Sequence, residues 1–309
     1  MARQARTRES PLAPGAAARY AFAMKWRRTR SDHVDDLRGA GGIGGGMGVP
    51  LAAGGGLIGI IVLLIAVLSG GGGGLGSMIE QMPGAVPDAS SADEVANEAQ
   101  SEEADFVEFL AEDTQAVWAA EFQKTGRQYQ YARLNMFTGQ VNTGCGPATS
   151  AVGPFYCPAD AEVYIDLDFF RELSDRFGAP GDFAQAYVIA HEIGHHVQNL
   201  LGISDEVRQR QQAASSQAEA NQWSVRLELQ ADCLAGVWAH SVYARGDLEP
   251  GDIEEGLAAA EAVGDDRIQE QAGMTVDPET WTHGSSAERQ EWFDRGFEAG
   301  ESSECNTFS

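Results

Sequence analysis

The alternation of apolar and polar positions predicts a folded domain that starts near Ala104 and is mostly helical. From there, apolar residues recur at the three- and four-residue spacing of a helix until Gly126 interrupts the pattern. Two stretches rich in aromatic and branched residues, Tyr129–Val141 and Glu162–Leu167, predict strands. Later stretches show helical periodicity, so we expect an α+β fold that is mostly helical.

Six further helices are predicted after the strands. They are expected at Asp168–Phe177, Ala186–Gly202, Glu206–Glu219, Asn221–His240, Asp252–Val263 and Glu288–Phe297. A loop rich in Gly and Pro, from Cys145 to Cys157, separates the two predicted strands. No internal repeat is visible along the chain.

The stretch Ala186–Gly202 holds the strongest candidate for chemistry. Its centre is an HExxH pattern, with His191 and His195 four residues apart. Side chains at this spacing lie on one helix face, with Cβ atoms roughly 5–6 Å apart, so both rings can face one metal ion. Glu192 lies beside the pair, where a carboxylate can accept a proton from a water on the metal. Two core histidines satisfied by hydrogen bonds are the alternative.

A second candidate pair lies in Asn221–His240, where Glu228 and Asp232 share one helix face. A catalytic zinc takes three protein ligands and keeps one open position, and two His with one Glu is an established set. We therefore expect Glu228 to be the third ligand. We expect Asp232 to accept the other N–H of a zinc-bound histidine and fix its orientation. Asp232 and His196 are the alternative third ligands, and an exposed helix with two carboxylates is the alternative without a metal.

A run of residues without charge, 39–79, interrupts the polar N-terminal part. Within it, residues 49–68 form an apolar stretch of about 20 residues, long enough to cross a bilayer of about 30 Å. We expect a single transmembrane helix there, in contact with the lipid bilayer. A cleaved signal peptide and a buried helix of a cytoplasmic protein are the alternatives.

Charge is distributed unevenly around this stretch. Residues 1–48 carry nine Lys and Arg against four Asp and Glu, whereas the chain after residue 68 carries twelve against 42. The positive-inside rule then predicts a basic cytoplasmic segment at 1–48 and a domain at 104–309 outside the cell membrane, joined by a flexible acidic linker at 69–103. A net charge of −25 argues against nucleic acid as a partner, because phosphate binding needs clustered Lys and Arg.

The four cysteines all follow the apolar stretch, which fits an oxidising compartment and two disulfides. Three connectivities are possible. Cys145 and Cys157 flank one loop and would staple it, and Cys233 with Cys305 would then tie the C-terminal tail to the Glu228 helix. Four buried thiols are the alternative if the orientation is wrong.

Several motifs together resemble the bacterial neutral zinc metallopeptidases. They are HEIGHHVQ, ELQADCLAG, GPFYCP, VYIDLDFF, GDFAQAYVIAHE and THGSSAERQEWF. The match runs from about Met24 to the C-terminus, so Met24 is a second hypothesis for the true start of the chain. More broadly, HExxH followed by ExxxD resembles the gluzincins, in which the Glu completes the zinc site. The resemblance implies a zincin-like metallopeptidase domain.

The resemblance also suggests two further parts of an active site. In proteases of this broad type, a His or Tyr away from the metal stabilises the oxyanion, and His283 in the Thr282-His283-Gly284 turn is the candidate. A structural or surface histidine is the alternative. In this broad fold an edge strand also aligns the substrate, and Tyr129–Val141 and Glu162–Leu167 are the candidates.

The sequence therefore predicts a membrane-anchored zinc endopeptidase that acts on peptides or proteins. Its Zn²⁺ would be held by His191, His195 and Glu228, with Glu192 as general base. The alternative is a membrane-tethered zinc-binding scaffold with little or no peptidase activity. Zinc-dependent hydrolysis of a non-peptide amide would use the same ligands.

Overall fold

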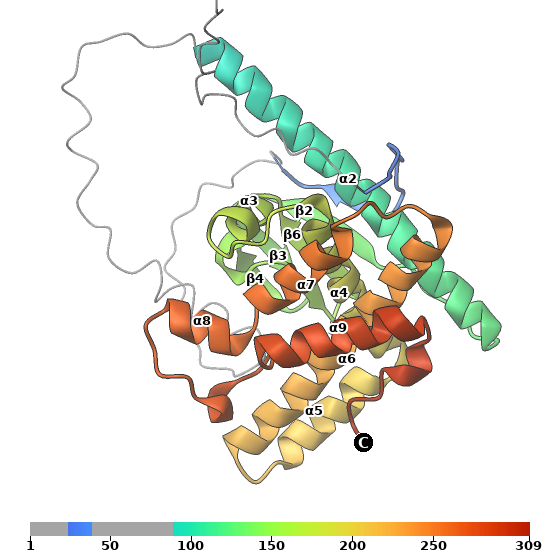
Figure 1. Ribbon diagram of the computed structural model, residues 1–309, viewed down its shortest axis with the longest axis vertical. Coiled ribbons are helices and arrows are strands. Elements are labelled where there is room, and N and C mark those ends of the chain that lie inside the picture. The colour runs from blue at the N-terminus through green and yellow to red at the C-terminus, as the bar shows by residue number, and fades with distance from the viewer. Residues whose placement is uncertain (1–23, 39–88) are drawn as a thin grey trace, which may run out of the picture.

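The computed structural model describes residues 24–38 and 89–309, which form a mixed, mostly helical α+β fold (Figure 1). This confirms the predicted mixture of elements. The first half contains β1 (Val34–Asp36), α2 (Ala89–Lys124), β2 (Arg133–Phe137), β3 (Gln140–Thr143), β4 (Gly146–Thr149), β5 (Phe155–Cys157) and β6 (Glu162–Asp166). The second half contains α3 (Asp168–Asp175), α4 (Asp182–Leu201), α5 (Ile203–Ala213), α6 (Gln217–Arg245), α7 (Asp252–Ala262), α8 (Asp265–Gln271) and α9 (Ser286–Ala299).

The main sheet has the strand order β1-β2-β6-β5. The first three strands run parallel and β5 is antiparallel to β6. β2 and β6 are almost entirely buried, because they have a strand on each side and α4 packs against the β6–β5 end. The two strands expected to offer an edge to a substrate are therefore interior, and that expectation was wrong. The edges of this sheet are β1 and β5.

The predicted strand Tyr129–Val141 contains a turn. The chain reverses at Gly139, whose φ of 77° is in the left-handed region that glycine adopts without strain. β3 and β4 then form a separate two-stranded hairpin, of which β4 lies within the predicted Cys145–Cys157 loop and β3 begins at the end of the predicted strand. The short helix α8 was also missed, because seven residues are too few to show a periodic pattern.

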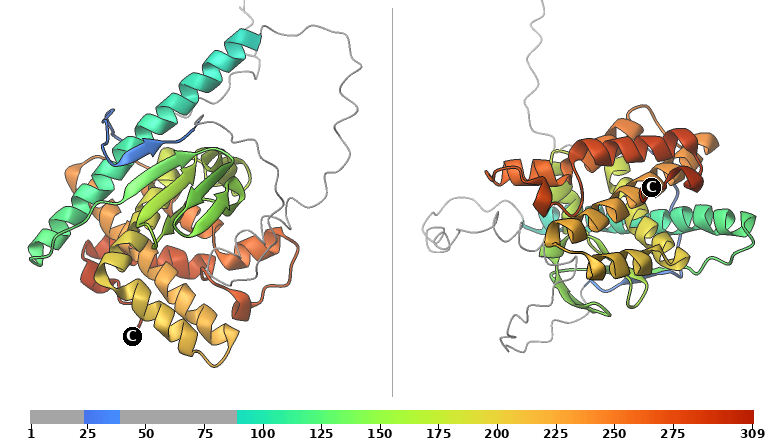
Figure 2. Two further views of the ribbon diagram at one scale, coloured as in Figure 1. Left: turned by 180° about the vertical axis from the view of Figure 1, so that it is seen from behind. Right: turned by 90° about the horizontal axis from the view of Figure 1, so that it is seen from below.

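Residues 24–38 belong to the folded domain. This corrects the prediction that they are part of a separate basic segment at 1–48. β1 pairs with β2 in the register Val34 to Leu134, and Figure 2 shows β1 lying beside the other strands. Trp26 contacts the ring of Phe106 on α2 with centroids 5.2 Å apart. A three-residue parallel strand carries no local pattern that distinguishes it from a polar tail, so the sequence did not reveal this pairing.

The predicted membrane helix at 49–68 lies outside the described residues. Among the helices that the structure does describe, none is long and apolar enough to cross a membrane. A single crossing at 49–68 would put β1 and β2 on opposite sides of the bilayer. That single crossing and the pairing of β1 with β2 therefore exclude each other in one molecule. The predicted linker 69–103 also needs correction, because α2 begins inside it at Ala89.

Helices α6 and α9 touch backbone to backbone. A Cβ atom on Gly236 would lie 2.0 Å from the carbonyl oxygen of Phe293, and one on Gly296 would lie 1.9 Å from that of Cys233. Neither space can hold a methyl group, so glycine is required at both positions for the helices to pack this closely. This crossing fixes where the side chains of α9 enter the core.

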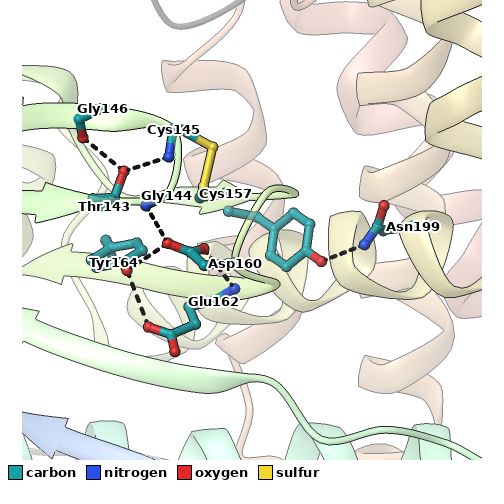
Figure 3. Close-up of a disulfide and its surroundings, with 10 residues drawn as sticks. Thr143, Gly144, Cys145, Gly146, Cys157, Asp160, Glu162, Tyr164 and Asn199 are labelled. Carbon is teal, nitrogen blue, oxygen red and sulfur yellow. Dashed lines mark hydrogen bonds between the residues drawn. A yellow bond between two sulfur atoms is a disulfide. The ribbon is translucent and has the colours of Figure 1, made fainter.

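Two disulfides join segments that the helices and strands do not join directly. Cys145 pairs with Cys157 and thereby ties the β3–β4 turn to the end of β5 (Figure 3). Cys233 on α6 pairs with Cys305 in the C-terminal tail. The pairing taken from the sequence is confirmed, and the chain has no free cysteine.

The two bridges are expected to contribute unequally to stability. The Cys233–Cys305 bridge closes a separation of 72 residues and the other bridge one of 12, so the loop-entropy model gives about 4 and about 3 kcal/mol. Replacing each pair with serine and measuring urea unfolding should show the larger loss for Cys233 and Cys305. An equal loss, or the reverse order, would show that the loop-entropy model does not apply here.

Candidate metal centre

Helix α4 carries the HExxH pattern through the core. It ends at Leu201 and is capped by Gly202, whose φ of 79° is left-handed and whose N–H donates to the carbonyls of Gln198 and Asn199. Both histidines of the pattern are well shielded from solvent, because α4 lies between the sheet and α6. Buried imidazoles need polar partners, and the structure supplies them from α6 and from α4 itself.

A close helix crossing brings α6 to the histidines. A Cβ atom on Gly194 would lie 3.1 Å from the carbonyl oxygen of Ala231, tighter than an ordinary contact. Gly194 lies between the two histidines in sequence, and Ala231 lies between Glu228 and Asp232. The crossing therefore sets both carboxylates of α6 against the HExxH face of α4.

His191, His195 and Glu228 form a group that could hold a metal ion. Glu228 Oε2 lies 3.2 Å from His191 Nε2, and its Oε1 lies 3.4 Å from His195 Nε2. Two ligand atoms at zinc–ligand distances of about 2.0–2.1 Å and at the tetrahedral angle are about 3.3–3.4 Å apart. Each of the two imidazole–carboxylate distances is close to this value, and one possible ligand atom from each of the three residues lies within 4.8 Å of the others.

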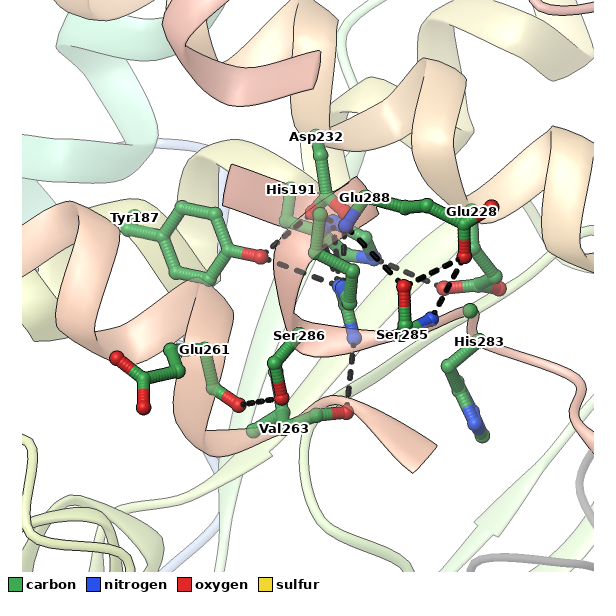
Figure 4. A network of polar contacts seen from close by, with 12 residues as sticks. Tyr187, His191, Glu228, Asp232, Glu261, Val263, His283, Ser285, Ser286 and Glu288 are labelled. Atoms are coloured by element: carbon green, nitrogen blue, oxygen red, sulfur yellow. Dashed lines mark hydrogen bonds and ion pairs between the residues drawn. The ribbon is translucent and has the colours of Figure 1, made fainter. Parts of the chain in front are cut away.

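His191 is oriented through its second ring nitrogen (Figure 4). Nδ1 donates to Asp232 Oδ1 over 2.8 Å, which leaves Nε2 as the nitrogen that faces Glu228. The same carboxylate oxygen accepts a hydrogen bond from the hydroxyl of Tyr187, one turn earlier on α4. Asp232 thus contacts His191 at Nδ1, on the other side of the ring from the nitrogen that faces Glu228.

Arg289 of α9 completes this arrangement. Its Nε and one terminal nitrogen donate to the two oxygens of Asp232 over 2.8 and 2.9 Å, a bidentate pair in the buried core. Burial, the largest effect, raises the pKa of Asp232, but Arg289 and His191 outweigh it and lower the pKa overall. Asp232 is therefore ionised at neutral pH.

His195 is oriented by a residue that the sequence analysis missed. Its Nδ1 donates to Gln198 Oε1 over 2.8 Å, which again leaves Nε2 for a metal. The amide of Gln198 is itself fixed, because its nitrogen donates to the carbonyl of Leu227 and to Gln230 Oε1. The spacing of three residues between His195 and Gln198 on one helix was the available signal.

The remaining histidine of the motif faces the other way. His196 Nε2 donates to the carbonyl of Gln130 over 2.6 Å, so its Nδ1 accepts from the hydroxyl of Tyr156. Burial, the largest effect, lowers the pKa of His196, which keeps it neutral. Both ring nitrogens are engaged on the sheet side of α4, so the geometry argues against His196 as a ligand.

Without a metal, the nearby carboxylates raise the pKa values of both histidines. Burial alone would lower the pKa of His191, but Asp232 and then Glu228 overcome that effect and raise it to about 10. The pKa of His195 is raised chiefly by Glu228, again against burial. The two histidines in turn hold the pKa of Glu228 well below its usual range despite its burial. The metal-free group therefore attracts either protons or a cation.

The two predicted catalytic residues flank this group. Glu192 is buried on α4 directly after His191. His283 lies in the turn before α9, where its Nδ1 is 3.0 Å from Asp265 Oδ1 and its Nε2 is left for another partner. Asp265 also accepts the backbone N–H groups of Thr282 and His283, so it fixes the whole turn. No sequence pattern pointed to Asp265, because its helix was not predicted.

The fold and this group together describe a mostly helical domain whose HExxH helix faces a carboxylate of α6, in a group that could hold a metal ion. The chain belongs to the family described as "Putative neutral zinc metallopeptidase", whose model matches residues 24–308. The resemblance noted from the motifs is thereby confirmed. The family name implies zinc, and imidazole with carboxylate donors suits that metal.

Curated relatives extend the match over most of the chain. "Uncharacterized protein YpfJ" of Escherichia coli (strain K12) is 48% identical over 292 residues, which is 92% of this chain and 99% of that protein. "Uncharacterized protein Rv2575" of Mycobacterium tuberculosis (strain H37Rv) is 50% identical over 192 residues, 59% of this chain and 64% of that protein. No solved structure matches the chain.

Removing Arg289 should destabilise the protein strongly. Arg289→Met leaves the buried carboxylate of Asp232 without its cation, and we expect a loss of about 3–5 kcal/mol in the free energy of unfolding. Arg295→Met is the matched control on the same helix, because its half-exposed pair with Glu304 is worth only about 0–1 kcal/mol. Denaturant unfolding measures both.

A double variant separates the charge from the packing. Adding Asp232→Asn to Arg289→Met removes the unpaired charge and should recover part of the lost stability. Similar losses for Arg289→Met and Arg295→Met would contradict the importance given to the buried pair.

Zinc affinity is expected to rise with pH. A metal needs the free electron pair of His191 Nε2, whereas in the metal-free protein His191 holds its proton until a pH of about 10. Each proton released on binding makes the apparent affinity increase by up to about tenfold per pH unit. Competition with a chelator of known protonation, measured from about pH 6 to pH 9, gives the slope. Glu192→Gln is the control, because it replaces a residue that is not a candidate ligand. A zinc affinity that does not change with pH in wild type would contradict this prediction.

Proposed function

We propose that this protein is a zinc-dependent endopeptidase. The observation that carries the proposal is that His191, His195 and Glu228 each place one possible ligand atom within 4.8 Å of the others, as three ligands of one zinc ion would have to be. Glu192 directly follows His191 on α4. A site that holds zinc for structure alone has no need of a carboxylate beside an open position.

The chain supplies the acid–base chemistry around the metal. Zinc bound there would bring the pKa of a water toward neutrality and polarise the carbonyl of the scissile peptide bond. Glu192 accepts the proton as the water oxygen bonds to the carbonyl carbon, and delivers it to the nitrogen when the C–N bond breaks. Asp232 and Gln198 hold the two imidazoles in their ligand orientation, so the site needs little rearrangement to bind the metal.

His283 is proposed to stabilise negative charge on the substrate oxygen. Its Nδ1 is held by Asp265, so its Nε2 can carry a proton toward the site. Burial, the largest effect, lowers the pKa of His283, but Asp265 and then Glu228 raise it overall, which favours the cationic donor form. A cation or N–H donor held in place is what oxyanion stabilisation requires.

An extended substrate is proposed to bind along β5. Among the strands of the described sheet, β5 is the edge next to α4, and its Tyr156 hydroxyl accepts a hydrogen bond from Asn199 of α4. A peptide added to such an edge gains main-chain hydrogen bonds without dependence on its side chains. This replaces the interior strands that the sequence suggested for the role.

Membrane attachment remains a prediction from the sequence at residues 49–68. Because β1 and β2 pair, we propose that any attachment leaves residues 24–38 and the peptidase domain on the same side of the bilayer.

The decisive test compares peptide cleavage with zinc content in the full chain. We expect wild type to cleave members of a mixed peptide library, and we expect Glu192→Gln to bind zinc fully while losing at least about a hundredfold in activity. Glu228→Ala should lose zinc, whereas Glu291→Ala, an exposed carboxylate on α9, should change neither property. His283→Ala should keep zinc and lower kcat. Mass spectrometry of products and metal analysis provide the two readouts.

The variants also show which assignment fails. If Glu228→Ala still bound stoichiometric zinc, the assignment of Glu228 as the third ligand would be wrong. Equal cleavage by wild type and Glu192→Gln would remove the proposed mechanism. Full zinc without any cleavage by wild type would favour the zinc-binding scaffold.

A further inference from the structure

Residues 302–309, which we call the tail, lie against α6 at the C-terminal end of the chain (Figure 1). Cys305 has two bonds to this helix, a disulfide to Cys233 and a hydrogen bond of 2.9 Å from Gln230 Nε2 to its carbonyl oxygen. Thr307 and Phe308 continue the contact toward the start of α6. The tail thus contacts positions of α6 that share one helix face, Trp223, Arg226, Gln230 and Cys233.

The bond from Gln230 to the tail is the last of three hydrogen bonds that begin at His195. His195 Nδ1 donates to Gln198 Oε1 over 2.8 Å, and Gln198 Nε2 donates to Gln230 Oε1 over 3.1 Å. Gln230 Nε2 then donates to the carbonyl of Cys305. Both glutamines are buried. A candidate zinc ligand is therefore joined to the tail by two side-chain amides.

Two backbone carbonyls fix the direction of these bonds. A carbonyl oxygen only accepts hydrogen bonds, so it has to face the nitrogen of a side-chain amide. The carbonyl of Leu227 lies 2.7 Å from Gln198 Nε2, and that of Cys305 faces Gln230 Nε2. Each glutamine therefore directs its oxygen toward the preceding donor. His195 has to donate at Nδ1, which leaves the electron pair of its Nε2 for a metal.

The orientation of Gln230 depends on the tail. In the described part of the chain, Cys305 is the hydrogen-bond partner of the Gln230 side-chain nitrogen. If the amide of Gln230 turned over, its NH₂ group would face the NH₂ group of Gln198, and two donors would oppose each other. Gln198 would then lose one of the two acceptors that hold it against His195.

We propose that the tail positions a zinc ligand. Cys305, acting through Gln230 and Gln198, holds His195 in the tautomer that binds zinc, and the disulfide to Cys233 holds the carbonyl of Cys305 in place. Gln230 is thus a positioning residue, which contacts the candidate ligand only through Gln198. This inference rests on the metal site of the proposed function and does not depend on peptide cleavage.

Replacing Gln230 tests the proposal through zinc affinity in the full chain. Gln230→Met keeps most of the side-chain volume and removes both hydrogen bonds. We expect it to bind zinc about tenfold more weakly than wild type, in competition with a chelator, because residues that orient metal ligands have effects of this size. Gln115→Met is the matched control. Gln115 is a buried glutamine of α2 that binds the backbone of Ala111 and Ala132, so its replacement should lower the thermal midpoint and leave zinc affinity unchanged.

Hydrogen exchange distinguishes positioning from a general loss of stability. In zinc-loaded protein with isotope-labelled histidine, NMR can follow how fast each Nδ1–H exchanges with solvent. Gln230→Met should make the exchange at His195 at least roughly tenfold faster, because its acceptor is no longer held. The exchange at His191, whose Nδ1 donates to Asp232, should stay as it is in wild type.

A variant of the disulfide tests the part played by the tail. Cys233→Ser with Cys305→Ser frees the tail and keeps Gln230, so it should weaken zinc binding by a similar factor. Adding Gln230→Met to this pair should change the affinity little further, because both changes act by the same route. The serine pair also tests the proposal by itself if Gln230→Met does not fold.

The possible failures can be told apart. Unchanged zinc affinity in Gln230→Met would overturn this inference and leave the metal site intact. Additive losses in the combined variant, or equally faster exchange at both histidines, would show that the tail does not act through Gln230. If wild type bound no zinc, the metal site of the proposed function would be wrong, and this inference with it.

Discussion

The buried carboxylate of Asp232 is the point on which three helices of this domain depend. It lies on α6, and it binds Tyr187 and His191 of α4 and Arg289 of α9. An ionised carboxylate with no exposed surface costs several kcal/mol unless each oxygen has charged or polar partners. Separating any one of these helices would leave that charge incompletely satisfied. Helix α4 is therefore fixed by an interaction that lies next to the atoms that could bind a metal.

Close backbone packing makes this interaction possible. Gly194 lets α4 approach α6, and Gly236 and Gly296 let α6 and α9 touch. At these three positions glycine provides space within a regular helix, since the contact atoms belong to the neighbouring backbone. A methyl group at Gly296 would push α9 away and carry Arg289, two turns earlier, out of reach of Asp232. The geometry of the site thus follows from residues that have no chemistry of their own.

The sequence revealed those parts of the site that a single helix determines. The spacing of His191 with His195, and of Glu228 with Asp232, sets side chains on one face whatever surrounds the helix. Contacts between distant segments were not accessible in the same way. The pairing of β1 with β2, the edge position of β5 and the approach of Asp265 to His283 depend on how the chain closes in space. The role of Gln198 had a local signal in its spacing from His195, and it was overlooked.

The charged groups around His191 also determine which of its ring nitrogens carries a proton. His191 lies between Asp232 at Nδ1 and Glu228 at Nε2, and two carboxylates on one imidazole would favour a doubly protonated ring. Arg289 holds Asp232 in its ionised form, so that the Nδ1 proton stays on His191. The proton at Nε2 is then the one that a metal displaces. Arg289 therefore acts on the candidate metal site through Asp232 and His191. The tautomer of His191 is determined by α9, a helix that contributes no candidate ligand.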